Sequence, residues 1–172
     1  SCMIDYPFTG FRNDEFDIEL ISGCEYFISN GGGPESVAIA SQRKVFAINA
    51  FLIPCGFDVQ RGIFIPKVLR DSSTGMVLSI SEMMERGILL SMKQEDFSEA
   101  NVTVHENSKD EILKGFFDFY NYENNNSTIE DKDLIKEYIK IRNKISYLNN
   151  IEQFADNVIA PSFLRKYPQF LQ

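Results

Sequence analysis

The stretch CEYFISNGGGPESVAIASQRKVFAIN, from Cys24 to Asn49, contains the pattern that decides the fold. Its first part, residues 24–29, is rich in aromatic and β-branched residues, which is typical of a strand. Three glycines follow, and then Pro34 suits the first position of a helix, where its missing N–H would have no intrahelical partner. The small residues that continue to position 43 predict a short helix, and the last part of the stretch starts a second strand. Strand, glycine loop, helix and strand in this order predict a parallel α/β unit.

The rest of the chain continues to alternate between the two kinds of element. Helix signals, such as a capping residue followed by apolar residues at helical spacing, occur over 12–23, 79–87, 107–122 and 127–149. Strand signals occur over 44–54, 62–67 and 101–106. We interpret 3–8 as the end of a strand and 160–172 as one or two short helical turns. The sequence therefore predicts an α/β fold with a Rossmann-like parallel sheet flanked by helices, and extra C-terminal helices without strands.

Length and composition limit the possible partners. With 172 residues, the chain is long enough for one domain with a substantial core, spanning 1–172. Its net charge of −8 argues against a nucleic acid, which would need clustered Lys and Arg. No apolar run approaches the length of a membrane-spanning helix. The three cysteines, Cys2, Cys24 and Cys55, match no metal-binding spacing, and we interpret them as reduced thiols in a cytoplasmic protein.

The glycine loop between the first strand and the following helix is typical of an anion-binding site. The first amides of a helix lack intrahelical partners, and the helix dipole favours negative charge beside them. Because glycine has no side chain, a phosphate can approach these amides closely. In open α/β sheets, ligands bind at the carboxyl ends of the strands, where this loop is expected. The same glycines, Gly31, Gly32 and Gly33, also fit a tight turn with no ligand.

The loop matches neither the G-x-G-x-x-G fingerprint nor a Walker loop, which disfavours an ordinary NAD or ATP site. Glu35 follows in the first turn of the helix, where an acid stabilises the helix by itself but would repel a phosphate placed beside it. A ligand that has both phosphates and hydroxyls removes this conflict. The phosphates would lie on the glycine amides, and Glu35 would accept hydrogen bonds from sugar hydroxyls. A nucleotide diphosphate therefore fits better than free phosphate.

The segment ISNGGGPESVAIASQRKVFAIN resembles the donor-binding segment of GT-B glycosyltransferases and of the related UDP-N-acetylglucosamine 2-epimerases. In these proteins a strand leads to Ser-Gly-Gly-x-x-Glu, a short helix, a basic residue and a second apolar strand. Asn30 stands at the Ser position, Gly31 and Gly32 at the glycines, and Glu35 at the acid. The resemblance implies that Glu35 binds ribose hydroxyls and that the glycine loop binds the diphosphate.

A group of bacterial glycosyltransferases linked to surface carbohydrate synthesis is more similar still. The chain contains three segments that resemble motifs of this group and follow one another in the same order: DYPFTGFRNDEFDIEL, IFIPK and PSFLRKYPQFL. The resemblance therefore extends from about Ile4 to Leu171. It implies that this is the C-terminal half of a GT-B fold and a fragment of a longer two-domain protein. The N-terminal Rossmann domain, which usually carries the acceptor site and the catalytic base, would be missing, so the segment alone is not expected to catalyse.

Two basic residues complete the candidate site. Arg12, in a loop before the first helix, is either a surface residue or a group that neutralises the leaving diphosphate. Lys67, at the end of a predicted strand, is either a surface residue or a diphosphate or acceptor contact. The candidate nucleotide-sugar site comprises Arg12, Asn30, Gly31, Gly32, Gly33, Glu35, Ser36 and Lys67.

Other chemistries lack the residues they need. His105 is the only histidine, and we interpret it as structural because it has no second His or Cys partner for a zinc site or a catalytic triad. Ser36 has no paired histidine, which argues against serine hydrolysis. No metal or other cofactor is expected, because the helix end and basic side chains would balance the diphosphate charge.

Three hypotheses follow from these observations. The first is a donor-binding domain of a glycosyltransferase, with a nucleotide sugar as donor and a saccharide or a lipid-linked acceptor, in the cytoplasm or at the face of the inner membrane. The second is an epimerase-type enzyme acting on UDP-N-acetylhexosamine. The third is a non-catalytic interaction domain with a degenerate donor site, for which a closed glycine loop would be evidence. Homo-oligomer formation stays open.

Overall fold

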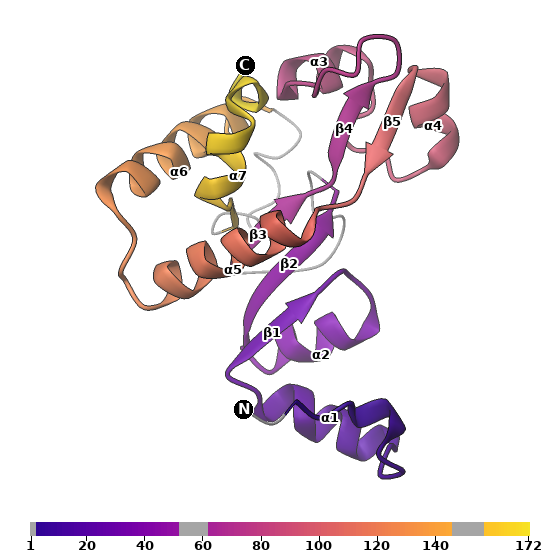
Figure 1. The fold of residues 1–172 in the computed structure, drawn as a ribbon, viewed down its shortest axis with the longest axis vertical. Coiled ribbons are helices and arrows are strands. Elements are labelled where there is room, and N and C mark those ends of the chain that lie inside the picture. The colour runs from indigo at the N-terminus through magenta and orange to yellow at the C-terminus, as the bar shows by residue number, and fades with distance from the viewer. Residues whose placement is uncertain (1–2, 52–61, 146–156) are drawn as a thin grey trace.

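A four-stranded parallel sheet forms the centre of the molecule (Figure 1). The computed structural model describes residues 3–51, 62–145 and 157–172. The strands lie in the order β1 (Tyr26–Ser29), β2 (Lys44–Ala50), β3 (Gly62–Pro66) and β6 (Asn157–Ile159). Each neighbouring pair is parallel. The prediction of a parallel sheet flanked by helices, with further helices towards the C-terminus, is confirmed.

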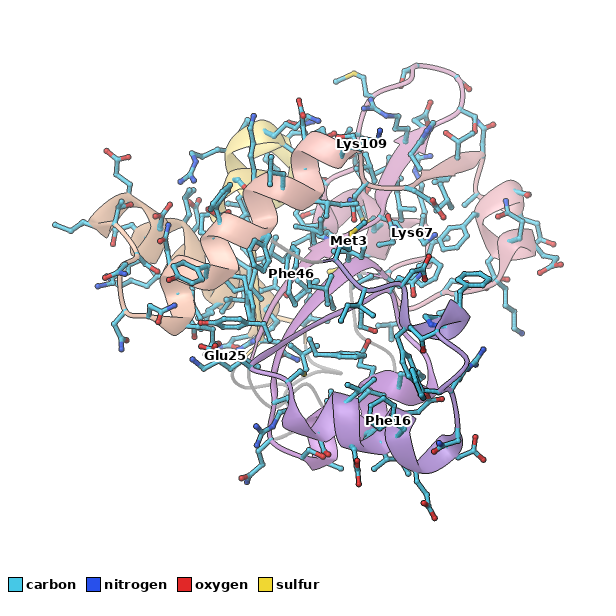
Figure 2. The ribbon with its side chains drawn as sticks, turned by 60° about the horizontal axis from the view of Figure 1, so that its bottom comes forward. Met3, Phe16, Glu25, Phe46, Lys67 and Lys109 are labelled. Atoms are coloured by element: carbon cyan, nitrogen blue, oxygen red, sulfur yellow. The ribbon has the colours of Figure 1, made fainter. Side chains whose placement is uncertain are left out.

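Helices cover both faces of this sheet. Successive residues of a strand point to opposite faces, and in β2 Val45 packs against Ala38 of α2 (Gly33–Ala40), together with Ile21 of α1 (Asp14–Gly23). Phe46 faces the other way and stacks on Phe119 of α5 (Lys109–Glu123). Figure 2 shows Phe46 beneath α5. The small residues of α2 therefore allow a close approach to the sheet, as the sequence predicted, although the helix begins one residue before Pro34.

A second, antiparallel sheet stands beyond the end of β3. It pairs β4 (Val68–Asp71) with β5 (Val102–His105), and between them the chain forms α3 (Ile80–Glu85) and α4 (Gln94–Glu99) (Figure 1). The strand expected over 101–106 is confirmed, but it lies outside the parallel sheet. The sequence analysis did not predict β4 or α4.

The C-terminal part differs from the prediction in one respect that matters for the sheet. It contains α6 (Ile129–Arg142), α7 (Pro161–Lys166) and the short 3-10 helix η4 (Pro168–Leu171), as expected of a helical end. However, the prediction that this part has no strand is wrong, because β6 pairs with β3. The helix predicted to extend to position 149 ends at Arg142, and positions 146–149 lie outside the described residues.

Capping chemistry fixes the ends of several helices where the sequence indicated it. Asn13 accepts a hydrogen bond from the Phe16 N–H at the start of α1. Reciprocal capping boxes begin α3, α5 and α6, at Ser79, Ser108 and Thr128. At the N-terminus, the strand end predicted over 3–8 is wrong: Tyr6–Phe8 form a 3-10 helix, η1.

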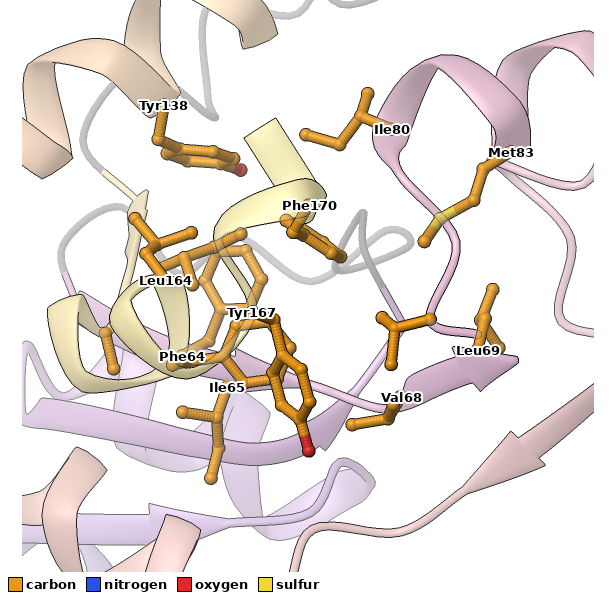
Figure 3. Close-up of a cluster of buried hydrophobic side chains, with 14 of the residues drawn as sticks. Phe64, Ile65, Val68, Leu69, Ile80, Met83, Tyr138, Leu164, Tyr167 and Phe170 are labelled. Carbon is orange, nitrogen blue, oxygen red and sulfur yellow. The ribbon is translucent and has the colours of Figure 1, made fainter. Parts of the chain in front are cut away.

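The main core lies between the sheet and the C-terminal helices. Figure 3 shows side chains of β3, β4, α3, α6, α7 and η4 pointing towards one another, among them Phe64, Ile80, Tyr138 and Phe170. Phe163 of α7 contacts both Tyr167 and Phe170 through its ring. Aromatic packing thus joins α7 to η4, the segment that follows it.

Candidate functional site

The candidate site lies at the edge of the parallel sheet where β1, β2 and β3 end. In the register of the sheet, Ser29, Ala47 and Phe64 stand side by side, so the residues that follow them emerge at the same edge. The glycine loop follows β1, and Lys67 follows β3. Neighbouring strands are about 4.8 Å apart, so β1 and β3, which lead to the loop and to Lys67, lie about 10 Å apart across the sheet. The topology therefore brings these two predicted elements to one edge.

The backbone of the loop requires glycine at two positions. Gly31 has φ +94° and Gly32 has φ +113°, a region that residues with a Cβ rarely adopt. A Cβ placed on Gly31 or Gly33 would meet no atom within 4 Å, and on Gly32 only Pro34 Cδ at 4.0 Å. The loop is therefore open, and its glycines serve backbone conformation and access rather than tight packing.

Some amides of the loop are used and others are free. The Gly31 N–H donates to Ser29 Oγ at 2.9 Å, and the Glu35 N–H donates to the Gly32 carbonyl at 3.1 Å. Within the described residues, nothing accepts from the N–H groups of Gly32 or Gly33. No side chain caps this helix, because its N-cap residue is Gly32. An anion at this position would therefore find two unpaired donors and the positive end of the helix dipole.

Glu35, two residues after Gly33 in the first turn of α2, is buried. Its side chain belongs to a residue that is only 4% exposed, and its Oε2 atom has no hydrogen-bond partner in the part of the chain that the structure describes. A buried polar atom without a partner costs roughly 1–3 kcal/mol. A ligand hydroxyl that donates to Oε2 would remove this cost. The neighbouring predicted residues Asn30 and Ser36 are exposed at the two ends of the loop.

Lys67 is held at the same edge by three contacts. Its backbone N–H donates to the Ala50 carbonyl at 2.6 Å. Its Nζ lies 3.6 Å from Glu106 Oε1 and 5.7 Å from the centre of the Phe51 ring. The Lys67 side chain is 21% exposed, so the ammonium is partly enclosed and still open to a ligand.

Arg12 is not brought to the loop by any contact of the described chain. Its Nε lies 3.9 Å from Asp17 Oδ2 of the first turn of α1, and its side chain is 64% exposed. This is the geometry of a weak surface ion pair. Its expected role with a diphosphate stays a prediction.

Asn49 and Asn107 form a feature at this edge that the sequence analysis missed. The Asn49 N–H donates to Asn107 Oδ1 at 2.7 Å, and the Asn107 N–H donates to Asn49 Oδ1 at 2.6 Å. The Asn107 Nδ2 donates to the Pro66 carbonyl at 2.8 Å. The sequence signal was slight: an Asn at the end of an apolar strand, and another before a capping Ser.

A cleft of about 650 Å³ lies elsewhere, between α5 and α7. Its charged residues largely satisfy one another, since Glu111 accepts from Lys166 Nζ and Tyr167 Oη, and Arg165 pairs with Asp118. Against a rise from burial, the hydrogen bonds from Tyr167, Lys166 and Ser108 lower the pKa of Glu111 to about 2. Because none of the predicted site residues line this cleft, we interpret its ion pairs as a clamp between the two helices.

The remaining reactive residues give no second site. His105 ends β5 exposed, with its Nε2 3.0 Å from Thr103 Oγ1. Cys24 is a free thiol, and burial raises its pKa, while Cys2 and Cys55 lie outside the described residues. Across residues 3–51, 62–145 and 157–172, no three His, Cys, Asp or Glu side chains gather as metal ligands would. No helix in the same ranges has the length and apolar character needed to span a bilayer.

Comparisons with known proteins found no relative of this chain. No family model matches the sequence, no curated protein matches it, and no solved structure matches the fold.

Proposed function

We propose that this chain is the donor-binding domain of a GT-B glycosyltransferase and that it binds a nucleotide-diphosphate sugar for bacterial surface carbohydrate synthesis in the cytoplasm. The observation that carries the proposal is a combination of two features: the Gly32 and Gly33 N–H groups and the buried Glu35 Oε2 all lack a partner among the residues that the structure describes. The first feature suits a phosphate, and the second suits a hydroxyl donor. A ligand with both groups satisfies the two features at once.

In this proposal each residue has a role that follows from its position. The diphosphate lies on the Gly32 and Gly33 amides at the start of α2, and Glu35 accepts from ribose hydroxyls. During transfer, an acceptor oxygen forms a bond to the anomeric carbon and its proton passes to the catalytic base, while the bond between that carbon and the diphosphate oxygen breaks and its electron pair stays on the diphosphate. The helix end and the Lys67 ammonium stabilise the charge that develops there. The acceptor and the catalytic base belong to the other half of the enzyme.

The open loop favours this proposal over a non-catalytic domain, for which loop amides already bonded to protein groups were expected. The epimerase alternative shares the same glycine and acid site and differs in the residues of the partner half. The full-length sequence therefore distinguishes the two enzymes.

The test is a calorimetric titration of UDP, GDP and CMP sugars into the protein and its Glu35→Gln variant. We expect one nucleotide to bind, and Glu35→Gln to weaken it about tenfold, because the neutral amide is a poorer acceptor than a carboxylate for the ribose hydroxyls. Glu15→Gln is the matched control, since Glu15 occupies the first turn of α1 and is exposed.

A second pair of variants tests the glycine loop. Gly32→Ala strains a backbone with φ +113° and places a methyl group beside the amides, whereas Gly75→Ala replaces another glycine of positive φ, +71°, in a distant turn. The proposal expects Gly32→Ala alone to reduce nucleotide binding. If no nucleotide binds at millimolar concentration, or if both glycine variants reduce binding equally, the donor-site assignment is wrong.

A further inference from the structure

The end of β2 departs from regular strand geometry at Asn49. The register between β2 and β3 shifts between Ala47 and Ala50, and Asn49 has φ +51°. Asn is one of the few residues that adopt this left-handed conformation without severe strain. The irregularity places both the N–H and the side chain of Asn49 opposite Asn107, 58 positions later in the sequence.

Asn107 connects this irregularity to the end of β3. It is 8% exposed, and its amide accepts from the Asn49 N–H and donates to the Pro66 carbonyl. Side-chain amides that satisfy backbone groups in this way are costly to remove, because each lost partner leaves a buried polar group unpaired. Asn49 and Asn107 therefore tie together the ends of two strands and the residue before the cap of α5.

The groups that hold the Lys67 ammonium are neighbours of this pair in the chain. Glu106, which lies 3.6 Å from Lys67 Nζ, directly precedes Asn107. Phe51, whose ring lies 5.7 Å from the same Nζ, is two residues after Asn49 and stacks on Phe97 of α4. Lys67 itself follows Pro66, whose carbonyl Asn107 binds.

We infer that Asn49 and Asn107 are positioning residues that fix the Lys67 ammonium at the ligand edge of the sheet. They act through Lys67 and do not contact the ligand. This inference rests on the proposed function, because it assumes that the ligand of the glycine loop also reaches Lys67. It adds two residues, distant in sequence, to the set that determines donor affinity.

The test is a double-mutant cycle with UDP as the probe, or GDP where GDP binds more tightly. Asn49→Gly keeps the left-handed backbone and removes only the carboxamide, so it perturbs the pair without adding strain. We expect Asn49→Gly and Lys67→Ala each to weaken binding roughly tenfold, and the double variant to bind no more weakly than Lys67→Ala alone. Asn49→Asp retains the Oδ1 acceptor and should restore most of the affinity.

The matched control is Asn101→Gly, since Asn101 also has a positive φ, of +57°, and lies in a turn before β5. It should leave nucleotide affinity unchanged while urea denaturation reports its effect on stability. If the effects of Asn49→Gly and Lys67→Ala on affinity multiply, the pair has only a structural role and the inference is wrong. If wild type and Glu35→Gln show the same nucleotide affinity, the proposed function fails first, and this inference fails with it.

Discussion

Gly115 in the middle of α5 gives the sharpest test of how closely the helix packs on the sheet. A Cβ at this position would lie 2.9 Å from Phe46 Cζ and 3.0 Å from Ile65 Cγ2. Both of those residues are fully buried, so neither can move without disturbing its own neighbours. Gly115→Ala gains about 1 kcal/mol of helix propensity. Overpacking of a core typically costs about 1–3 kcal/mol.

Because the contacts are with a buried ring and a branched methyl group, we expect the cost of overpacking to lie at about 2–3 kcal/mol and to exceed the gain. The net loss should be about 1–2 kcal/mol in the free energy of unfolding, which lowers the midpoint of thermal unfolding by about 2–8 °C. Urea denaturation and calorimetry measure both quantities. Gly23→Ala is the control, since a Cβ at the end of α1 would meet nothing within 4 Å.

A second measurement separates packing from any general effect of the substitution. In a Phe46→Leu background, two of the three atoms nearest to the new methyl group, Phe46 Cζ and Cε2, are absent, so Gly115→Ala should cost less or become stabilising. If Gly115→Ala in the wild type is as stable as the parent, α5 does not lie on β2 and β3 as closely as described.

Two further changes test the clamp between α5 and α7 and the capping of α3. The folded-state pKa of Glu111, about 2, lies below its usual value of 4.5, so its stabilising contribution is complete above pH 4.5 and is lost as the pH falls towards 2. Glu111→Gln should therefore be less stable at pH 7 by about 3 kcal/mol. It should also lose less stability than the wild type as the pH falls from 7 to 2, which a series of urea denaturation curves at these pH values measures. An equal loss of stability in both proteins would contradict the lowered pKa of Glu111. Ser79→Ala removes the oxygen that accepts from the Glu82 N–H and should cost about 1 kcal/mol in urea denaturation, whereas no change would show that the cap contributes nothing.

The sequence predicted the β1–α2–β2 unit because the signals there are local. Apolar periodicity, a glycine loop and a proline stand next to one another, and each acts over a few residues. The same holds for the capped helices, where a Ser or Thr and an acid three positions later form reciprocal hydrogen bonds. The open conformation at Gly31 and Gly32 also follows from local chemistry, since other residues rarely adopt positive φ there.

The missed elements depend on contacts that are distant in the chain. β6 has only three residues, Asn157–Ile159, and all three are buried, so it shows no alternation that distinguishes a strand from a buried helix. β5 does alternate, but the sequence does not show that its partner is β4 rather than a strand of the parallel sheet. Arg12 stays a prediction, because the motif assigns it to the site and no contact of the described chain brings it to the loop.

The pair of Asn49 and Asn107 could not be predicted for the same reason. Each residue has an ordinary local interpretation, as a strand end or as a residue before a helix cap. Only the fold brings them together, across 58 positions, through the two hydrogen bonds between them. The backbone conformation of the glycine loop is thus visible in the sequence, whereas the hydrogen bonds at the neighbouring strand ends are not.

The most direct test of the donor-site account is the response of individual backbone amides to a nucleotide. In ¹⁵N–¹H correlation spectra recorded during titration with the UDP, GDP or CMP sugar that binds in calorimetry, the account predicts large, saturable shifts of the Gly32 and Gly33 amide signals. Shifts confined to α5 and α7 around the cleft at Lys114, with the two glycine signals unmoved, would contradict it.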